Sequence, residues 1–486
     1  MFKLYSLTLL FAGSGLLCFL NAGNMQVFLT FMLNLICITM GLYRAISCKK
    51  VNLDVIIWFF VYTFFFLAPV IQINYSSYFP NSMPIESSYV VKANLLIFLW
   101  NVIYLLFRKK RVDDGAGEAV GETVGEEVRE AVRESSGNSS AANHNLQLET
   151  MLDTISWQLK TIYFVVSLII FAMTFALFKF PYFLGHADYD SIISNKSLLL
   201  LANIGLPGIV FANWIFAFVE IRKKYHVWNV IYIIVSSLIA IYQINPLNSS
   251  RFYIGFSVIM IIYMFYHKKI TSGGFILYIF IGLFVVFPLL NFFRFGFSEF
   301  EMPSLNELMF KQLTQLHFDA YSNIVATLKY CEVNGISYGY EMLGVLLFFV
   351  PRSIWASKPL SSGEAVGDFI SGQYALKFNN LSNPIMSEFY KNFGWLGVMG
   401  GALLIAFLVN RFESPGRADR YTYSLIAGYL FMIYRGDLMS AFAYSFGTYV
   451  IMVLVPSWAG KAGRMQKLQK VKNLGNERRE FKGIQL

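Results

Sequence analysis

Residues 53–73 read LDVIIWFFVYTFFFLAPVIQI and carry one charged side chain, Asp54, near their beginning. A membrane-spanning helix needs about 20 mainly apolar residues, and this stretch meets that requirement. Similar apolar stretches recur along the whole chain of 486 residues, of which 56% are hydrophobic and only 14% are charged. Because soluble domains carry about 25% charged residues, this composition predicts an all-α polytopic membrane protein.

Twelve stretches of this kind predict twelve transmembrane helices. They are residues 4–22, 26–43, 53–73, 89–107, 155–178, 197–219, 227–244, 252–266, 274–293, 395–410, 422–434 and 442–458. Clusters of Lys and Arg follow the even-numbered stretches and therefore fall on one side of the membrane, together with Lys3. Basic loops favour the cytoplasmic side, so we expect both termini to be cytoplasmic.

The order of these stretches divides the chain into six parts. They are the first four spans in 1–111, an acidic cytoplasmic linker in 112–150, spans five to nine in 151–293, a large outer loop in 294–393, the last three spans in 394–458 and a basic cytoplasmic tail in 459–486. The linker repeats GEAV, GETV, GEEV and REAV, and its glycines and acidic residues predict disorder. Within the outer loop, the apolar run 339–351 is short for a span and predicts a re-entrant or interfacial helix.

The sequence contains none of the common motifs of nucleotide, metal or nucleophilic sites, namely GxGxxG, GxxxxGK[ST], GxSxG, HExxH and CxxC. Its five histidines are scattered, which does not predict a metal cluster. We therefore expect no cofactor and no metal. Basic cytoplasmic loops explain the net charge of +10, so we expect no nucleic-acid partner.

Five basic residues are expected on the outer side, where cations are disfavoured. They are Arg251, Arg294, Arg352, Lys358 and Arg435. Ionisable residues within a membrane are costly and mark functional sites by default, although a single arginine is as often a structural ion pair. A guanidinium binds phosphate through two parallel hydrogen bonds, so the set predicts a site for lipid-linked phosphates.

Acidic and polar candidates are expected at the same surface. Asp319 and His317 lie in LHFDAY, Glu388, Tyr390 and Asn392 lie in SEFYKNFG, and Asp437 follows Arg435. A carboxylate placed there is able to accept the proton of a sugar hydroxyl. Glu388 lies just before the span 395–410 and is the first candidate for this base, and Asp319 is the second.

Two segments carry a resemblance to a known family. FFVPRSIWASKP (348–359) and NPIMSEFYKNFGWLGVMGG (383–401) resemble the O-antigen polymerase (Wzy) family, also called oligosaccharide repeat unit polymerases. That family has a Pro-Arg-Ser-x-Trp-x-x-Lys-Pro stretch followed by a Glu-x-Tyr-x-Asn-Phe-Gly-x-x-Gly stretch that enters a helix. YTFFFLAPVIQ (62–72) and HFDAY (317–321) are similar to its early span and its outer loop.

The resemblance implies a GT-C-like glycosyltransferase at the periplasmic face of the bacterial inner membrane. Such an enzyme joins oligosaccharide repeat units carried on undecaprenyl diphosphate into O-antigen or a related surface polysaccharide, with a flippase and a chain-length regulator as partners. Arg352, Arg294 and Lys358 would then stabilise the departing diphosphate, and Arg251 and Arg435 would hold a second phosphate. Glu388 or Asp319 would act as the base, and His317, Tyr390, Asn392 and Asp437 would bind sugar.

Three other functions compete with this interpretation. A ligase that moves the finished polymer from the same carrier to lipid A core or to protein would need the same topology and the same arginines. A transporter or flippase would place its charges in the middle of spans and in repeated halves, and the sequence shows no such repeat. A membrane O-acyltransferase would need a histidine-centred site, and the cytoplasmic loops offer only His226 and His267.

Overall fold

The structure is a computed structural model in which part of the chain is described. The described residues are 2–19, 23–48, 50–109, 155–183, 189, 192–193, 199, 201–245, 247, 251–267, 269–289, 310–374, 376, 379–414 and 420–459. The predicted acidic linker (112–150), the tail from 460 and Arg294 lie outside them. Throughout the described part the chain forms helices and no β-strand, which confirms the predicted all-α class.

Seven helices among the described residues are long and apolar enough to cross a membrane. They are Met25–Ser47, Leu53–Tyr75, Ser87–Phe107, Trp157–Phe183, Ser272–Leu289, Ile385–Glu413 and Leu438–Ala459. Three shorter apolar helices cover Leu7–Phe19, Val227–Gln243 and Tyr253–Tyr266. Helices α11 (Leu206–Lys223) and α20 (Arg420–Arg435) occupy the two remaining predicted stretches. The chain is therefore a membrane protein with several spans.

The chain divides into two compact units. The first unit comprises Met1–Arg129, Val258–Ala418 and Tyr423–Ser445, and the second comprises Glu130–Ser257, Asp419–Thr422 and Phe446–Leu486. In the second unit, α9 (Trp157–Phe183) packs against α11 and α12 (Val227–Gln243). An ion pair of 2.8 Å between Lys160 Nζ and Glu220 Oε1 joins α9 to α11.

The stretch that dominates the sequence forms the central helix of the first unit. Helix α3 (Leu53–Tyr62) continues through a π-helical turn, Thr63–Leu67, into α4 (Ala68–Tyr75). In its most apolar window 83% of the residues are buried, the largest fraction among the candidate spans. A helix that is hydrophobic on all sides fits either a protein interior or a lipid-facing position, and its burial here places it in the interior.

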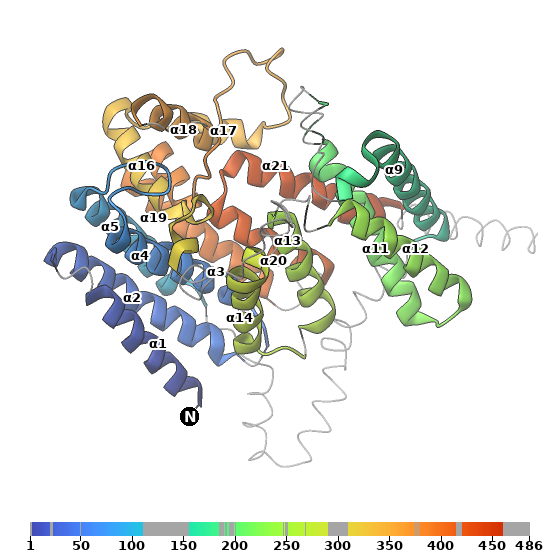
Figure 1. Ribbon diagram of the computed structural model, residues 1–486, viewed down its shortest axis with the longest axis horizontal. Coiled ribbons are helices and arrows are strands. Elements are labelled where there is room, and N and C mark those ends of the chain that lie inside the picture. The colour runs from blue at the N-terminus through green and yellow to red at the C-terminus, as the bar shows by residue number, and fades with distance from the viewer. Residues whose placement is uncertain are drawn as a thin grey trace, which may run out of the picture. The chain divides into compact units, whose positions relative to one another are not determined.

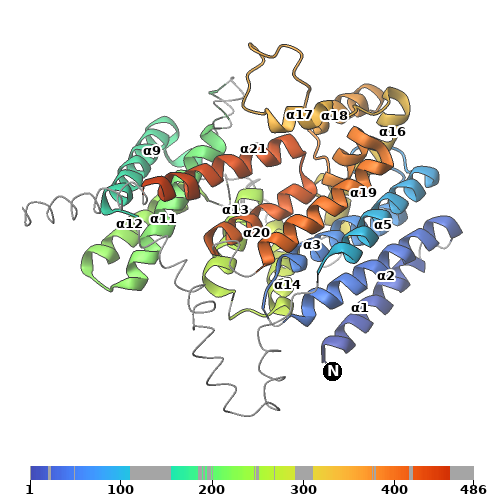
Figure 2. The same cartoon turned by 180° about the vertical axis from the view of Figure 1, so that it is seen from behind.

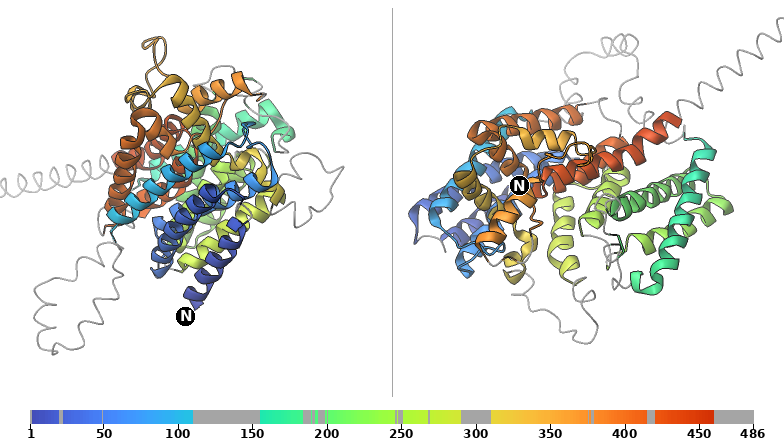
Figure 3. Two further views of the ribbon diagram at one scale, coloured as in Figure 1. Left: turned by 90° about the vertical axis from the view of Figure 1, so that its left-hand side faces the viewer. Right: turned by 90° about the horizontal axis from the view of Figure 1, so that it is seen from above.

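Helix α5 (Ser87–Phe107) joins the two sides of this unit. It packs against α2 (Met25–Ser47) on one side and α19 (Ile385–Glu413) on the other, as Figures 1 and 2 show. Helix α1 (Phe2–Phe19) packs in turn on α2 (Figure 3). The N-terminal helices and the C-terminal third of the chain therefore share one core.

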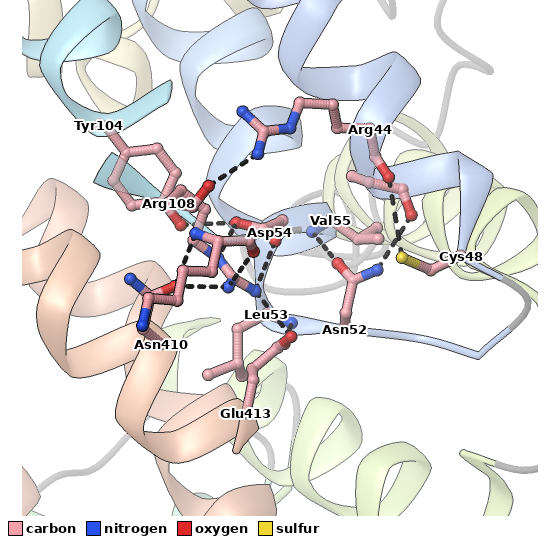
Figure 4. Close-up of polar contacts among 12 residues, drawn as sticks. Arg44, Cys48, Asn52, Leu53, Asp54, Val55, Tyr104, Arg108, Asn410 and Glu413 are labelled. Carbon is pink, nitrogen blue, oxygen red and sulfur yellow. Dashed lines mark hydrogen bonds and ion pairs between the residues drawn. The ribbon is translucent and has the colours of Figure 1, made fainter. Parts of the chain in front are cut away.

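One end of this bundle is held by a buried arginine, Arg108, at the C-terminal end of α5 (Figure 4). Its guanidinium lies 2.8 Å from Asp54 Oδ2 at the start of α3 and 2.7 Å from Glu413 Oε2 at the end of α19. Burial lowers the pKa of Arg108, but the two carboxylates outweigh this effect and raise it. The ends of three helices are thus fixed to one charge.

At the opposite end of the bundle, the segment from residue 310 onward packs on the ends of α4 and α5. Gln72 of α4 contributes to this packing, because its Nε2 donates to the carbonyls of Leu313 and Phe318 at 2.7 and 3.0 Å. Helices α16 (Ala320–Asn334) and α18 (Ser362–Gln373) follow in this segment. The predicted short helix in 339–351 is α17, but it covers only Tyr340–Leu346, and turns replace the rest.

Helix α19 is broken near its beginning by a glycine. Gly394 has φ 63° and ψ −148°, a backbone conformation that is open essentially to glycine alone. Three residues later, a Cβ on Gly397 would lie 2.1 Å from the carbonyl oxygen of Phe389. Both glycines of the NFGWLG stretch are therefore required by the kink, which separates the turn that carries Glu388 from the long apolar part of the helix.

We predict that Gly394→Ala destabilises the protein by about 1–3 kcal/mol, because alanine is strained at this φ and ψ. Thermal unfolding of the purified protein in detergent, followed by intrinsic fluorescence, measures the effect. Gly400→Ala in the same helix is the matched control, since a Cβ there meets nothing within 4 Å. Equal melting temperatures for the two variants would contradict the structural reason given for the kink.

Candidate functional site

Two buried carboxylates lie at the end of the first unit opposite Arg108. Asp319 is 2% exposed and precedes α16, and Glu388 is 1% exposed in the first turn of α19. These are the two carboxylates that the sequence singled out as bases. A buried carboxylate needs hydrogen-bond donors or a cation around it, and each of them has such partners.

Asp319 is bound from three directions. Its Oδ1 receives hydrogen bonds from Ser382 Oγ at 2.8 Å and from Arg435 Nη2 at 3.1 Å, and its Oδ2 receives one from Asn323 Nδ2 at 2.9 Å. Arg435 is one-third exposed, and its Nε is buried without a hydrogen-bond partner. The predicted cation Arg435 is therefore paired with Asp319, the second predicted base, and its Nε–H makes no hydrogen bond.

Glu388 is bound by the neighbouring helices. Its Oε1 accepts hydrogen bonds from the backbone N–H of Leu438, at 2.8 Å, and from Ser362 Oγ. The Ser362 hydroxyl in turn accepts a hydrogen bond of 3.0 Å from Asn383 Nδ2. Asn383 Oδ1 accepts a further hydrogen bond from Thr327 Oγ1. A continuous polar chain therefore joins α16, α18, α19 and the start of α21 (Leu438–Tyr449).

Two short segments bring both carboxylates into one system. Ser382 Oγ donates a hydrogen bond to Asp319. The next residue, Asn383, donates one to Ser362, which in turn donates to Glu388. In the same way, Arg435 at the end of α20 binds Asp319, and Leu438 at the start of α21 binds Glu388. The corner between α20 and α21 is thus held at both of its ends by a buried carboxylate.

Asp437 lies in this corner and caps α21. Its Oδ1 accepts a hydrogen bond of 3.0 Å from the N–H of Met439. Burial raises the pKa of the Asp437 carboxyl above its ordinary value, although hydrogen bonds from Ser440 and Met439 oppose the shift. This geometry gives Asp437 a structural task, and its predicted contact with sugar stays a prediction.

The remaining polar candidates have different surroundings. Asn392 is fully buried, and it accepts a hydrogen bond of 2.9 Å from Ser337 Oγ and donates one of 2.9 Å to the Glu388 carbonyl. Tyr390 packs edge-on against Trp395, with ring centroids 5.6 Å apart. His317 is exposed in the 3-10 turn Leu316–Phe318. Of these three side chains, His317 is the most open to a ligand.

A further ion pair was missed by the sequence analysis. Lys391 Nζ lies 2.7 Å from Glu341 Oε1 and 4.4 Å from the centre of the Tyr330 ring, and the lysine side chain is 1% exposed. The pair fixes α17 to the start of α19. A lysine four residues before the predicted span 395–410 is typical of an interfacial residue, so the only signal for its burial was the acid at position 341.

The loop that follows α17 carries two cations without an acid. Arg352 donates to the carbonyls of Lys358 and Pro359 at 2.6 and 3.2 Å, and Lys358 Nζ donates to the carbonyls of Phe348 and Val350 at 2.6 and 3.0 Å. Among the described residues, no carboxylate lies within 4.0 Å of either cation, whereas Arg108 has two. Burial and the charge of Arg352 lower the pKa of Lys358.

This loop, residues 347–361, is the cationic loop, and it projects from the first unit. It leaves the helices around it and extends beyond α17 and α18 (Figures 1 and 2). Its contacts run between side-chain cations and its own carbonyls, which fixes the guanidinium while leaving its charge uncompensated. A fixed and uncompensated guanidinium beside an ammonium is an anion-binding arrangement.

The other two predicted cations cannot be added to this site. Arg294 lies outside the described residues. Arg251 begins α13 (Arg251–Ile261) in the second unit, and its side chain is not described. In the described ranges, no group of three His, Cys, Asp or Glu side chains has the arrangement of a metal site.

No family model, no curated protein and no solved structure matches the chain. The function therefore has to be argued from the chemistry of the site.

We predict that Arg435→Ala lowers the free energy of unfolding by about 1–3 kcal/mol, because it leaves the buried Asp319 without its cation. Adding Asp319→Asn should recover part of this loss. The double variant should therefore lose less stability than the sum of the two single losses. Melting temperatures of the four proteins in detergent measure the coupling. Arg352→Ala, whose guanidinium contacts only its own loop, is the control and should differ little from the parent.

Proposed function

We propose that this chain is a lipid-linked oligosaccharide polymerase of the O-antigen polymerase family. The observation that carries the proposal is the loop with Arg352 and Lys358, two cations held by backbone carbonyls and compensated by no described acid. Such a site fits a diphosphate group. The apolar spans place the protein in a membrane, where a lipid carrier resides. The resemblance of residues 348–359 and 383–401 to the family supports the same proposal.

The reaction is a displacement at a sugar carbon. A hydroxyl of the acceptor repeat unit attacks the anomeric carbon of the donor glycan, and the bond from that carbon to the diphosphate oxygen breaks. The diphosphate leaves with the bonding electrons, and the hydroxyl proton passes to a carboxylate, for which Glu388 is the first candidate and Asp319 the second. No cofactor takes part in this scheme.

The cations do the main catalytic work in this proposal. Charge grows on the diphosphate as it leaves, so fixed cations stabilise the transition state more than the ground state. In this scheme Arg352 and Lys358 stabilise the departing diphosphate, and Arg435 holds a phosphate of the second carrier. Arg435 suits this role because its side chain is one-third exposed.

The carboxylates must change their surroundings to act as bases. Asp319 and Glu388 are 2% and 1% exposed, whereas a general base needs to reach the proton it removes. The proposal therefore includes a movement of the α20–α21 corner, because Arg435 and Leu438 of that corner cover the two carboxylates. Sugar would then meet His317, Tyr390, Asn392 and Asp437 near the opened corner.

We further propose twelve crossings of a bacterial inner membrane in a GT-C-like arrangement, with both termini cytoplasmic and the site periplasmic. Helix α20 is one of the proposed crossings. It has only 16 residues, but Tyr423 near its start donates to Glu413 beside Arg108, and Arg435 at its end binds Asp319. It thus connects the two ends of the bundle. A chain-length regulator and a flippase are the expected partners.

The topology predicts which cysteines an impermeant maleimide labels in intact spheroplasts. Ile354→Cys in the cationic loop is expected to react from outside, because Ile354 is 79% exposed. Lys109→Cys at the Arg108 end should react only after the membrane is opened. Both variants are made in a Cys331→Ala background, since Cys331 is the least buried native cysteine. The opposite labelling pattern would contradict the proposed orientation.

The function predicts a defect in surface polysaccharide. A deletion strain should show lipopolysaccharide with core plus a single repeat in place of a ladder on a silver-stained gel. Arg352→Ala should fail to restore the ladder, and Arg352→Lys should restore it in part, because lysine keeps the charge and loses the bidentate geometry. Lys109→Ala, which removes an exposed cation at the other end, should restore the ladder fully.

Three results would overturn this assignment. Core without any repeat, with polymer left on its carrier, would identify a ligase. Full restoration of the ladder by Arg352→Ala would remove the cationic loop from the mechanism. If the lipopolysaccharide ladder is unchanged by the deletion, the same comparison is made on capsule and exopolysaccharide extracts, and unchanged chain lengths in all three would reject the polymerase.

A further inference from the structure

The first unit contains an open groove outside the cationic loop. Its volume is about 640 Å³, within the usual range of about 300–1,000 Å³ for sites that bind small molecules. It is lined by Tyr75, Ser76, Tyr78, Phe79, Ser82, Thr314 and Tyr374. The lining thus comprises four aromatic rings and three aliphatic hydroxyls, with no charged side chain.

One wall of the groove is a tight turn between α4 and α5. Phe79 N–H donates to the Met83 carbonyl at 2.8 Å, and Ser82, with φ 66°, donates to the Phe79 carbonyl at 2.9 Å. The fully buried Asn81 donates a hydrogen bond of 3.1 Å to Asn323 Oδ1 on α16. The turn is therefore held in place before any ligand arrives, which lowers the entropic cost of binding.

Tyr374 forms another wall and is fixed by a lysine behind it. Lys329 Nζ donates to the Tyr374 hydroxyl at 2.7 Å and lies 5.5 Å from the centre of its ring. The same ammonium is bound by Glu86 at 2.8 Å, so its charge is compensated outside the groove. The hydroxyl of Tyr374 accepts from the lysine, which leaves its own hydrogen for another acceptor.

The lining identifies the class of ligand. A phosphate would need cations, and a lipid tail would need walls without hydroxyls, so neither fits this groove. A sugar ring has C–H faces that pack on aromatic rings and hydroxyls that bond to Tyr, Ser and Thr. Tyr75 and Tyr78 are 64% and 60% exposed, and they present rings of this kind to solvent.

We propose that this groove binds saccharide units of the glycan chain, as an uncharged subsite beside the reaction centre. The inference rests on the proposed function and adds the place where the sugar portion of a substrate lies. Asn323 connects the two sites, because it accepts from Asn81 of the groove wall and donates to Asp319 at 2.9 Å. The groove and the first unit's buried carboxylates therefore belong to one hydrogen-bonded region.

Binding of free oligosaccharide to the full-length protein in detergent tests the inference. The probes are phosphate-free oligosaccharides of one to three repeat units, prepared by partial acid hydrolysis of the surface polysaccharide of the host, with maltotriose as the reference sugar. Saturation-transfer NMR and calorimetry should detect binding of the repeat-unit probes. Tyr78→Ala should weaken it at least tenfold and Tyr78→Phe by no more than about threefold, because phenylalanine keeps the ring.

Two controls separate the groove from other causes. Tyr225→Ala removes an even more exposed tyrosine in the second unit and should leave binding unchanged. Lys109→Ala should also leave it unchanged, because the exposed Lys109 does not line the groove. Size-exclusion profiles and melting temperatures confirm that each variant is folded. No binding of any repeat-unit probe by the parent protein, or equal binding by Tyr78→Ala, would overturn the inference.

The outcomes also separate this inference from the proposed function. Tyr78-dependent binding in a protein whose deletion leaves every polysaccharide unchanged would support the groove and reject the polymerase. A polymerase defect in the deletion strain, together with a parent protein that binds none of the probes, would reject the groove alone. Shortened polysaccharide chains in a strain that carries Tyr78→Ala would support both.

Discussion

The corner between α20 and α21 depends on two buried carboxylates, and the candidate site depends on that corner. Burying an ionised carboxylate is costly unless donors surround it, and here the donors come from α16, α18, residues 382–383 and the corner itself. Each donor is therefore held in place by the carboxyl oxygen to which it donates. Residues more than one hundred positions apart, such as Asp319 and Arg435, are thereby fixed to one another.

The cations of the first unit have two kinds of partner, carboxylates and backbone carbonyls. Arg108 forms ion pairs with two carboxylates, so its charge is compensated and the ends of three helices are linked. Arg352 and Lys358 bind carbonyl oxygens of their own loop, and their charge remains available. This contrast separates a cation with acidic partners from cations whose partners are carbonyl oxygens. It also explains why counting charges in the sequence is a weaker guide than finding the acids near them.

Much of the fold was predictable because apolar length is a local property. Residues 53–73 were expected to span, and they form the central helix. The site was predictable only in part. Arg352 and Glu388 were recognised from short motifs, but the ion pair of Lys391 with Glu341, the bridge through Ser382 and Asn383 and the groove around Tyr78 combine segments far apart in the chain. No local pattern encodes such pairings, and the kink at Gly394 was likewise visible only in the backbone.

That kink has a consequence for how the sequence is free to change over time. Gly394 separates the turn bearing Glu388, Lys391 and Asn392 from about twenty apolar residues that run to Glu413. Apolar side chains that face lipid are interchangeable as long as they remain apolar, so that long portion tolerates evolutionary drift without displacing the polar turn. Divergent descendants of this chain are therefore expected to keep a short polar signature before Gly394 and the closely packed Gly397 and Gly401 after it, and to vary at the exposed apolar positions.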